Sequence, residues 1–172
     1  MKHALAGLNA ASDADFVAAC GGFFEHSPWV AERAAARRPF ASRDDLLRAM
    51  CEAVDAATED EQLALIRAHP DLVGQLARQG RLTRESTAEQ AAAGLSDLTP
   101  GDVAAFERLN AAYRERFDFP FIICARENKK DAILAAIPVR LKNTRQAEIA
   151  AALGEIYKIA RLRLSDAVGE PE

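Results

Sequence analysis

The 172-residue chain contains few of the residues from which metal sites and disulfide frameworks are built. It has three cysteines and three histidines. No two cysteines form a Cys-x-x-Cys pair, and no two histidines lie three or four residues apart. The sequence therefore predicts no disulfide framework, no zinc knuckle and no helical metal pair, and it is typical of a reduced intracellular setting.

Long apolar runs are also absent. No stretch approaches about eighteen uninterrupted apolar residues, so we expect no membrane span. The first residues lack the basic-then-apolar pattern of a signal peptide, and residues 168–172 do not form a peroxisomal address, which favours a cytoplasmic location. A net charge of −4 lacks the basic character of nucleic-acid-binding domains, so we expect no nucleic-acid partner.

The size and composition fit one globular domain. Apolar residues make up 49% of the chain and charged residues 28%, which is typical of a soluble folded protein. At this length a folded chain hides roughly 70% of its unfolded surface, so it needs no metal or disulfide for stability. We expect a single domain over residues 1–172, with its core at about 8–164.

Helix start signals recur along the chain. Ser12, Ser42, Thr58 and Thr99 each precede an acidic residue by three positions, which is the spacing of a capping box. Thr99 is also followed by Pro100, a favoured first helical residue. Apolar residues three or four positions apart follow these signals. The sequence thus predicts an all-α bundle of several helices.

Two places interrupt this pattern. Residues 119–124 form an apolar run with a proline and β-branched residues, which favours one short extended segment near 119–125. An isolated extended segment has no sheet to join, so its peptide groups need other partners and are available to a ligand. Pro138 lies inside a second helical pattern and is expected to kink or end that helix.

His69 is the histidine with the most informative position. Pro70 disfavours helical geometry at the residue before it, so a helix should end at His69. Pro70 is also a good first residue for a second helix. The imidazole then either caps the outgoing helix or points into a cleft, and the local sequence leaves both interpretations open.

Ser86 and Glu89 also allow two interpretations. Their spacing matches a capping box, which would make Ser86 the start of a helix. A helix N-terminus also binds anions or polar ligands, and Glu89 and Gln90 in the first turn would then contact the ligand.

The last helix distinguishes two arginines. Arg163 lies on the apolar stripe of this helix, seven residues after Ile156, whereas Arg161 points roughly 200° away. An inward arginine needs an acidic partner because an unpaired buried charge is costly. That partner is either a core acid such as Glu25 or an anionic ligand, and spacing alone does not choose between them.

Five segments, in this order, resemble the OHCU decarboxylases, the 2-oxo-4-hydroxy-4-carboxy-5-ureidoimidazoline decarboxylases of urate breakdown. They are Phe24 to Trp29, His69 to Leu72, Ser86 to Gln90, Phe119 to Arg126 and Glu155 to Leu164. The resemblance runs from about Leu8 to Leu164. Each segment alone is a weak signal, and the five in register are a specific one.

The resemblance implies an all-α fold, no metal or organic cofactor, and commonly a homodimer. It implies decarboxylation of a small anionic ureidoimidazoline to (S)-allantoin and CO₂. It also implies a role for each matching residue: His69 and Glu89 are expected to be catalytic, with His69 as the general acid/base. The substrate-binding residues implied are Pro70, Ser86, Glu89, Gln90, Phe121, Ile122, Ile123 and Arg163.

Two other functions compete with this interpretation. One is a non-enzymatic helical module that binds a peptide or protein in a groove between helices. The other is a related enzyme that acts on a different small cyclic ureide. A peptide groove does not need one histidine, one acid, one amide and one inward arginine at the ends of helices, which disfavours the first alternative.

Overall fold

The computed structural model describes residues 2–169, apart from the side chains of Leu76 and Arg78. The chain divides into two compact units. The first unit comprises residues up to 68 together with those from 157 onward, and the second comprises residues 69–156. Residues 170–172, on which part of the targeting expectation rests, lie outside the described residues.

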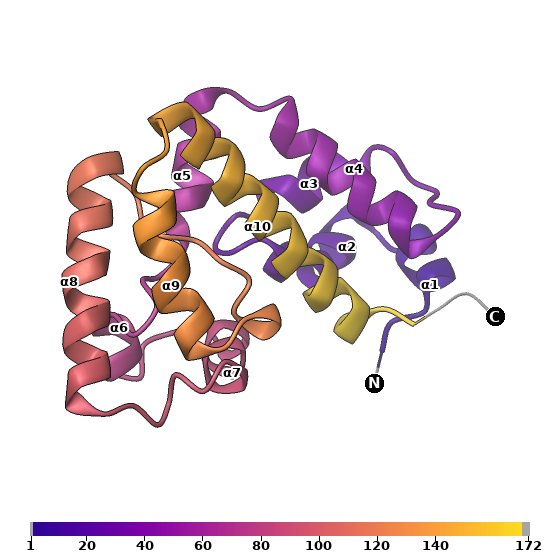
Figure 1. Ribbon diagram of the computed structural model, residues 1–172. Helices are drawn as coiled ribbons and strands as arrows, with labels where there is room; N and C mark the ends of the chain where they lie inside the picture. The colour runs from indigo at the N-terminus through magenta and orange to yellow at the C-terminus, as the bar shows by residue number, and fades with distance from the viewer. Residues whose placement is uncertain (1, 170–172) are drawn as a thin grey trace. The chain divides into compact units, whose positions relative to one another are not determined.

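The described residues are largely helical and contain no β-strand, which confirms the all-α prediction (Figure 1). An isolated β-bridge pairs His3 with Val168 within the first unit. In the part of the chain that the structure describes, no helix combines the length and the apolar character needed to cross a bilayer.

The first unit is built from short helices around an apolar core. Its elements are α1 (Leu5–Ala10), α2 (Asp13–Cys20), the 3₁₀ turn η1 (Gly21–Phe23), α3 (Trp29–Ala35), α4 (Arg43–Asp55), α5 (Glu59–Ala68) and the second part of α10 (Arg145–Ala167). Helices α3 and α4 lie side by side (Figure 1). The large side chains buried here include Phe16, Phe24, Leu46, Met50, Leu65 and Ile66.

Two of the predicted helix starts in this unit are simple side-chain caps. The hydroxyl of Ser12 accepts a hydrogen bond from the N–H of Asp15 at 3.1 Å, and α2 begins at the next residue. Ser42 caps α4 in the same way, with its hydroxyl 3.1 Å from the N–H of Asp45. Both predictions are confirmed.

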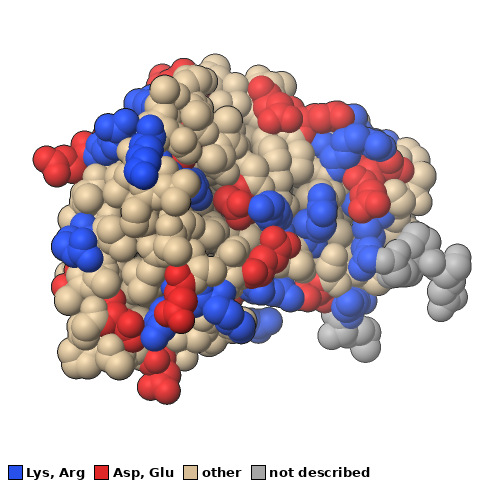
Figure 2. Space-filling view, in the orientation of Figure 1, with Lys and Arg blue, Asp and Glu red and all other residues tan. Residues whose placement is uncertain are grey.

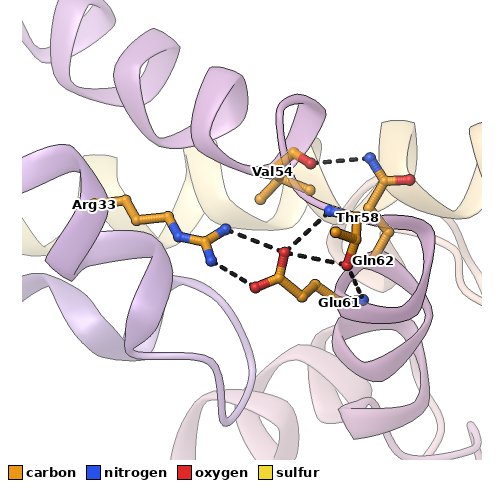
Figure 3. A network of polar contacts seen from close by, with 5 residues as sticks. All are labelled: Arg33, Val54, Thr58, Glu61 and Gln62. Carbon is orange, nitrogen blue, oxygen red and sulfur yellow. Dashed lines mark hydrogen bonds and ion pairs between the residues drawn. The ribbon is translucent and has the colours of Figure 1, made fainter.

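The start of α5 carries a larger network of polar contacts (Figure 3). Thr58 donates its N–H to Glu61 at 3.0 Å, and the N–H of Glu61 donates to the Thr58 hydroxyl at 3.3 Å, as the capping-box spacing predicts. Arg33 on α3 donates to the same carboxylate at 2.5 Å. The hydrogen bonds from Arg33 and Thr58 lower the pKa of Glu61.

The lowered pKa of Glu61 predicts how its contribution to stability depends on pH. A carboxylate with a depressed pKa stabilises the fold above its unfolded pKa of about 4.3, and this contribution is lost as the pH falls through the lower folded value. The free energy of unfolding of a Glu61→Gln variant should therefore lie below wild type at pH 6 and approach it near pH 3. Urea denaturation at several pH values measures the difference, and an unchanged gap at pH 3 would contradict the assignment.

The second unit is built around two neighbouring helices, α8 and α9, and a cluster of aromatic rings. Its elements are α6 (Gln75–Arg78), α7 (Arg84–Ala92), α8 (Pro100–Phe117), the 3₁₀ turn η2 (Ala125–Glu127), α9 (Lys130–Arg140) and the first part of α10. Helices α8 and α9 lie side by side (Figure 1). The capping box predicted at Thr99 is complete, because Thr99 and Asp102 exchange side-chain-to-backbone hydrogen bonds at 3.0 and 3.1 Å.

Helix α9 continues past its proline. The sequence led us to expect a kink or an end at Pro138, but the helix runs on to Arg140. The proline lies within the last turn, where few helical hydrogen bonds depend on it. The next bond along still forms, because the N–H of Leu141 donates to the carbonyl of Ile137 at 2.9 Å. Of the two expected outcomes, an end of the helix at Pro138 is therefore contradicted, whereas a kink there stays a prediction.

None of the three cysteines is exposed. Cys20 and Cys124 are buried and Cys51 is half-buried. Burial raises the pKa of Cys20 to about 12 and that of Cys51 to about 11, and it also raises the pKa of Cys124, which supports a packing role. Basic and acidic side chains are interspersed over the face shown in Figure 2.

Candidate active site

His69 is the first residue after α5 and its side chain is buried, with 6% of its surface exposed. The predicted helix end is thus confirmed. The predicted second helix does not begin at Pro70, because α6 starts only at Gln75. A turn fills the interval: the N–H of Gly74 donates to the carbonyl of Asp71 at 3.3 Å. Pro70 therefore lies in a loop over residues 69–74, which we call the His69 loop.

The His69 loop contains a strained residue. Val73 has a φ of 55°, in the left-handed region that β-branched residues strongly disfavour. Its neighbour Gly74 leaves room for the turn, since a Cβ there would lie 2.7 Å from the Cβ of Asp71. Such strain costs on the order of 1–3 kcal/mol and persists only where surrounding contacts impose it.

Three side chains bind three consecutive residues of this loop. Arg114 on α8 forms an ion pair with Asp71, with its Nε 2.9 and 3.0 Å from the two carboxylate oxygens. Asn110, one turn earlier on the same helix, donates to the carbonyl of Leu72 at 2.8 Å. Gln90 on α7 accepts from the N–H of Val73 at 3.1 Å. These contacts fix the backbone that follows His69.

Helix α7 carries the predicted residues Ser86, Glu89 and Gln90 on neighbouring turns. The cap at its start is Thr83, whose hydroxyl accepts from the N–H of Ser86 at 3.2 Å. The capping-box interpretation of Ser86 and Glu89 is therefore wrong, because the helix begins before them. Ser86 and Gln90 are buried and Glu89 is half-buried, so this face of α7 is turned away from solvent.

The contact with Val73 also fixes which way the amide of Gln90 points. The Val73 N–H is a donor, so the Gln90 oxygen must face it. The NH₂ end of Gln90 consequently points the other way and offers two donors.

The predicted extended segment is present at residues 119–124, which belong to neither a helix nor a strand. Its aromatic side chains anchor it to α8: the ring centroid of Tyr113 lies 6.0 Å from that of Phe119 and 5.3 Å from that of Phe121. Phe121 and Ile122 are buried, and Ile123 is half-buried.

Two charged side chains bind the backbone of this segment. Arg140 at the end of α9 donates to the carbonyl of Ile122 at 2.5 Å, and Glu155 on α10 accepts from the N–H of Cys124 at 2.8 Å. The prediction that these peptide groups need partners outside a sheet is confirmed at both positions.

A fully buried carboxylate, Glu148, holds Arg140 in place. It accepts from the Nε of Arg140 at 3.0 Å, from the amide of Asn143 at 2.8 Å and from the hydroxyl of Tyr113. Burial, followed by the bond to Glu148, raises the pKa of Tyr113, so its hydroxyl stays a donor. Sequence reasoning missed Glu148 and Arg140. The apolar stripe of α10 gives no signal for Glu148, because eight helical residues place it about 80° from Ile156 and on the other side of it from Leu153.

Arg163 lies in the first unit, where it is buried as its helical position predicts, whereas Arg161 is exposed. Its Nη1 forms an ion pair with the buried Glu25 at 2.8 Å and donates to the carbonyl of Gly22 at 3.2 Å. The sequence allowed either a core acid or an anionic ligand as the partner of this arginine, and in the structure the core acid Glu25 binds it. The neighbouring Ser27 and Pro28 form the corner before α3.

The predicted site residues other than Arg163 all belong to the second unit. Within it, α7 joins two of the predicted groups: Gln90 binds the His69 loop, and α7 packs against η2, which directly follows the extended segment. Among residues 2–169 the structure contains no group of three or more histidine, cysteine, aspartate or glutamate side chains placed to hold a metal ion.

Comparison with solved structures first supports the class of the fold, which is all-α. The fold matches a crystal structure of (S)-allantoin synthase with a TM-score of 0.74 and 30% sequence identity, over 96% of this chain and 54% of that one. The chain therefore spans about half the length of that protein.

Sequence comparison then establishes the family. The family model of the OHCU decarboxylases matches residues 9–165, across both units. The chain is 45% identical to a 2-oxo-4-hydroxy-4-carboxy-5-ureidoimidazoline decarboxylase of Haloferax volcanii, covering 92% of each chain. It is 43% identical to the protein of the same name from Amia calva, covering 95% of this chain and 94% of the relative. The chain belongs to the OHCU decarboxylase family.

The contacts of the His69 loop predict unequal effects of two substitutions on α8. Replacing the buried Asn110 with alanine leaves the Leu72 carbonyl without its donor, so the free energy of unfolding should fall by about 1–3 kcal/mol. Replacing Arg114 with alanine removes an ion pair whose arginine is 46% exposed, so the loss should stay below about 1 kcal/mol. Urea denaturation of both variants measures the difference, and equal losses would contradict this account of the loop.

Proposed function

We propose that this protein decarboxylates 2-oxo-4-hydroxy-4-carboxy-5-ureidoimidazoline to (S)-allantoin and CO₂ in urate degradation. Membership of the OHCU decarboxylase family over residues 9–165 supports the reaction. The name of the matched (S)-allantoin synthase supports the product.

The chemistry does not require an organic cofactor. The carboxylate leaves from a ring carbon next to an imine-like C=N bond, which accepts the electron pair of the broken C–C bond. Other decarboxylases obtain such an electron sink from pyridoxal phosphate or thiamine diphosphate. The protein then has to orient the substrate, stabilise the developing charge and deliver a proton to one face of the ring carbon that becomes the stereocentre.

We assign the proton transfer to His69, as general acid/base. The observation that carries this proposal is the position of His69: it is buried and precedes a loop whose next residues are held by Arg114, Asn110 and Gln90. A fixed backbone limits the movement of the imidazole, and positioned groups contribute most to catalysis.

The other predicted residues are proposed to bind the substrate. Glu89 would orient His69 or bind the hydroxyl and ureido groups, and Gln90 would donate its NH₂ to a carbonyl, in keeping with its fixed amide. Arg163 would pair with the carboxylate. The remaining proposed contacts are Pro70, Ser86, Phe121, Ile122 and Ile123.

Further parts of the proposal rest on the sequence alone. They are a single domain over residues 1–172, a cytoplasmic homodimer, no metal or organic cofactor, and no nucleic-acid or membrane partner.

The stereochemistry of the product tests the reaction. The substrate is generated enzymatically from urate, the protein is added, and circular dichroism follows the appearance of optically active allantoin. Spontaneous decay gives a racemate, so a dichroic signal that forms faster in the presence of the protein supports the proposal. Unchanged racemic decay would overturn it, and turnover of a different cyclic ureide would favour the related-enzyme alternative.

Substitution of His69 tests the catalytic assignment. A positioned general acid/base contributes typically about 10²- to 10⁴-fold, so His69→Ala should lower kcat by at least that much while the far-ultraviolet dichroism stays helical. Glu89→Gln, which keeps the size of the side chain, should also lower kcat. Because Thr83 and not Ser86 caps α7, a loss of activity in Glu89→Gln cannot come from a lost capping box. Wild-type turnover in the His69 variant would refute its role.

A further inference from the structure

The two charged side chains that bind the extended segment lie on either side of Ile123. Arg140 binds the carbonyl of Ile122, and Glu155 binds the N–H of Cys124. The Ile122 carbonyl and the Ile123 N–H belong to one peptide group, and the Ile123 carbonyl and the Cys124 N–H belong to the next. The peptide group is planar and trans, so its N–H and C=O point in opposite directions. Arg140 and Glu155 therefore set the directions of both polar groups of Ile123.

The side chain of Arg140 is fixed by contacts with Glu148 and with the ring of Phe121. Its Nη2 lies 2.8 Å from Glu148, and its guanidinium lies 4.4 Å from the ring centroid of Phe121. Its side chain is 14% exposed, and that of Glu148 is fully buried. The planar fork of an arginine can bind a carboxylate, a carbonyl and a ring face at once, which the point charge of a lysine cannot.

We propose that Arg140 and Glu155 are positioning residues for the substrate: they orient the N–H and C=O of Ile123 to bind the amide groups of a cyclic ureide. One main-chain donor and one main-chain acceptor match the alternating C=O and N–H groups of such a ring and its ureido arm. This inference rests on the proposed function, because it takes the ureidoimidazoline as the ligand of the segment.

Arg140 and Glu155, which we call the anchors, explain how an extended segment without a sheet can serve as a binding element. In a sheet, a neighbouring strand would occupy the polar groups of every second residue. Here side chains bind the carbonyl of the residue before Ile123 and the N–H of the residue after it, so the orientation of Ile123 is fixed without a strand beside it. Ile123 is also the half-buried residue of an otherwise buried run from Phe121 to Ala125.

The test compares variants of the anchors with a variant of the same network that leaves the anchors intact. Glu155→Ala removes the acceptor for Cys124, and Glu155→Gln restores one with its amide oxygen. Arg140→Lys keeps a positive charge for Glu148 but lacks the fork that reaches Ile122. Tyr113→Phe is the matched control, because it removes a bond to Glu148 and leaves both anchors in place.

We expect KM for the ureidoimidazoline to rise about tenfold in Glu155→Ala and Arg140→Lys, the change that corresponds to one lost hydrogen bond. KM should return to within about threefold of wild type in Glu155→Gln and stay at the wild-type value in Tyr113→Phe. A merely structural role would reduce the amount of active enzyme, which lowers the apparent kcat and leaves KM unchanged.

The outcomes separate this proposal from the proposed function. If the wild-type protein does not turn over the ureidoimidazoline, the proposed function fails and this inference fails with it. If the wild type is active and KM is unchanged in Glu155→Ala, or rises equally in Tyr113→Phe, the positioning role alone is overturned. Should Arg140→Lys fail to fold by circular dichroism, the Glu155 pair carries the test.

Discussion

The buried charge of Glu148 is the constraint on which the second unit depends. A carboxylate with no exposed surface is stable only when its oxygens are bonded, and removing one partner from such a group is strongly destabilising. Its partners come from three places: Tyr113 on α8, Arg140 at the end of α9, and Asn143 between α9 and α10. The carboxylate thereby fixes the ends of three helices, and through Arg140 it also fixes the carbonyl of Ile122. Both the stability of the second unit and the shape of the proposed binding segment thus depend on Glu148.

The same solution recurs in the His69 loop. Neither irregular stretch of the second unit has a sheet to bind its backbone, so helix side chains do so instead. The loop adds backbone strain at Val73, which is maintained because the Val73 N–H and the Leu72 carbonyl are both held from helices α7 and α8. Irregular backbone that is fixed from outside can present peptide groups and an imidazole in one lasting arrangement. In a regular helix those peptide groups would form the hydrogen bonds of the helix itself.

Local signals in the sequence predicted helix starts well, and they failed where two signals competed. Ser12 and Ser42 cap their helices at the predicted positions. One of the two interpretations made Ser86 a cap because Glu89 follows it by three, yet Thr83 has an equivalent side chain three residues earlier and is the N-cap of α7. Pro70 fits both the first turn of a helix and a loop, and the contacts that select the loop come from residues 90, 110 and 114. Such distant partners leave no trace in the local spacing.

Periodicity identified Arg163 as an inward arginine, and the structure adds that Glu25 is bound to it. The structure thus supplies a core acid as the partner of Arg163, and the contact of this arginine with the substrate stays a proposal. The acid sets the direction of the arginine before a ligand arrives, and it also offsets the positive charge. A substrate carboxylate would then be recognised more by the planar shape of the guanidinium than by net charge. That makes the fork shape of Arg163, which a lysine lacks, the property on which its proposed role depends.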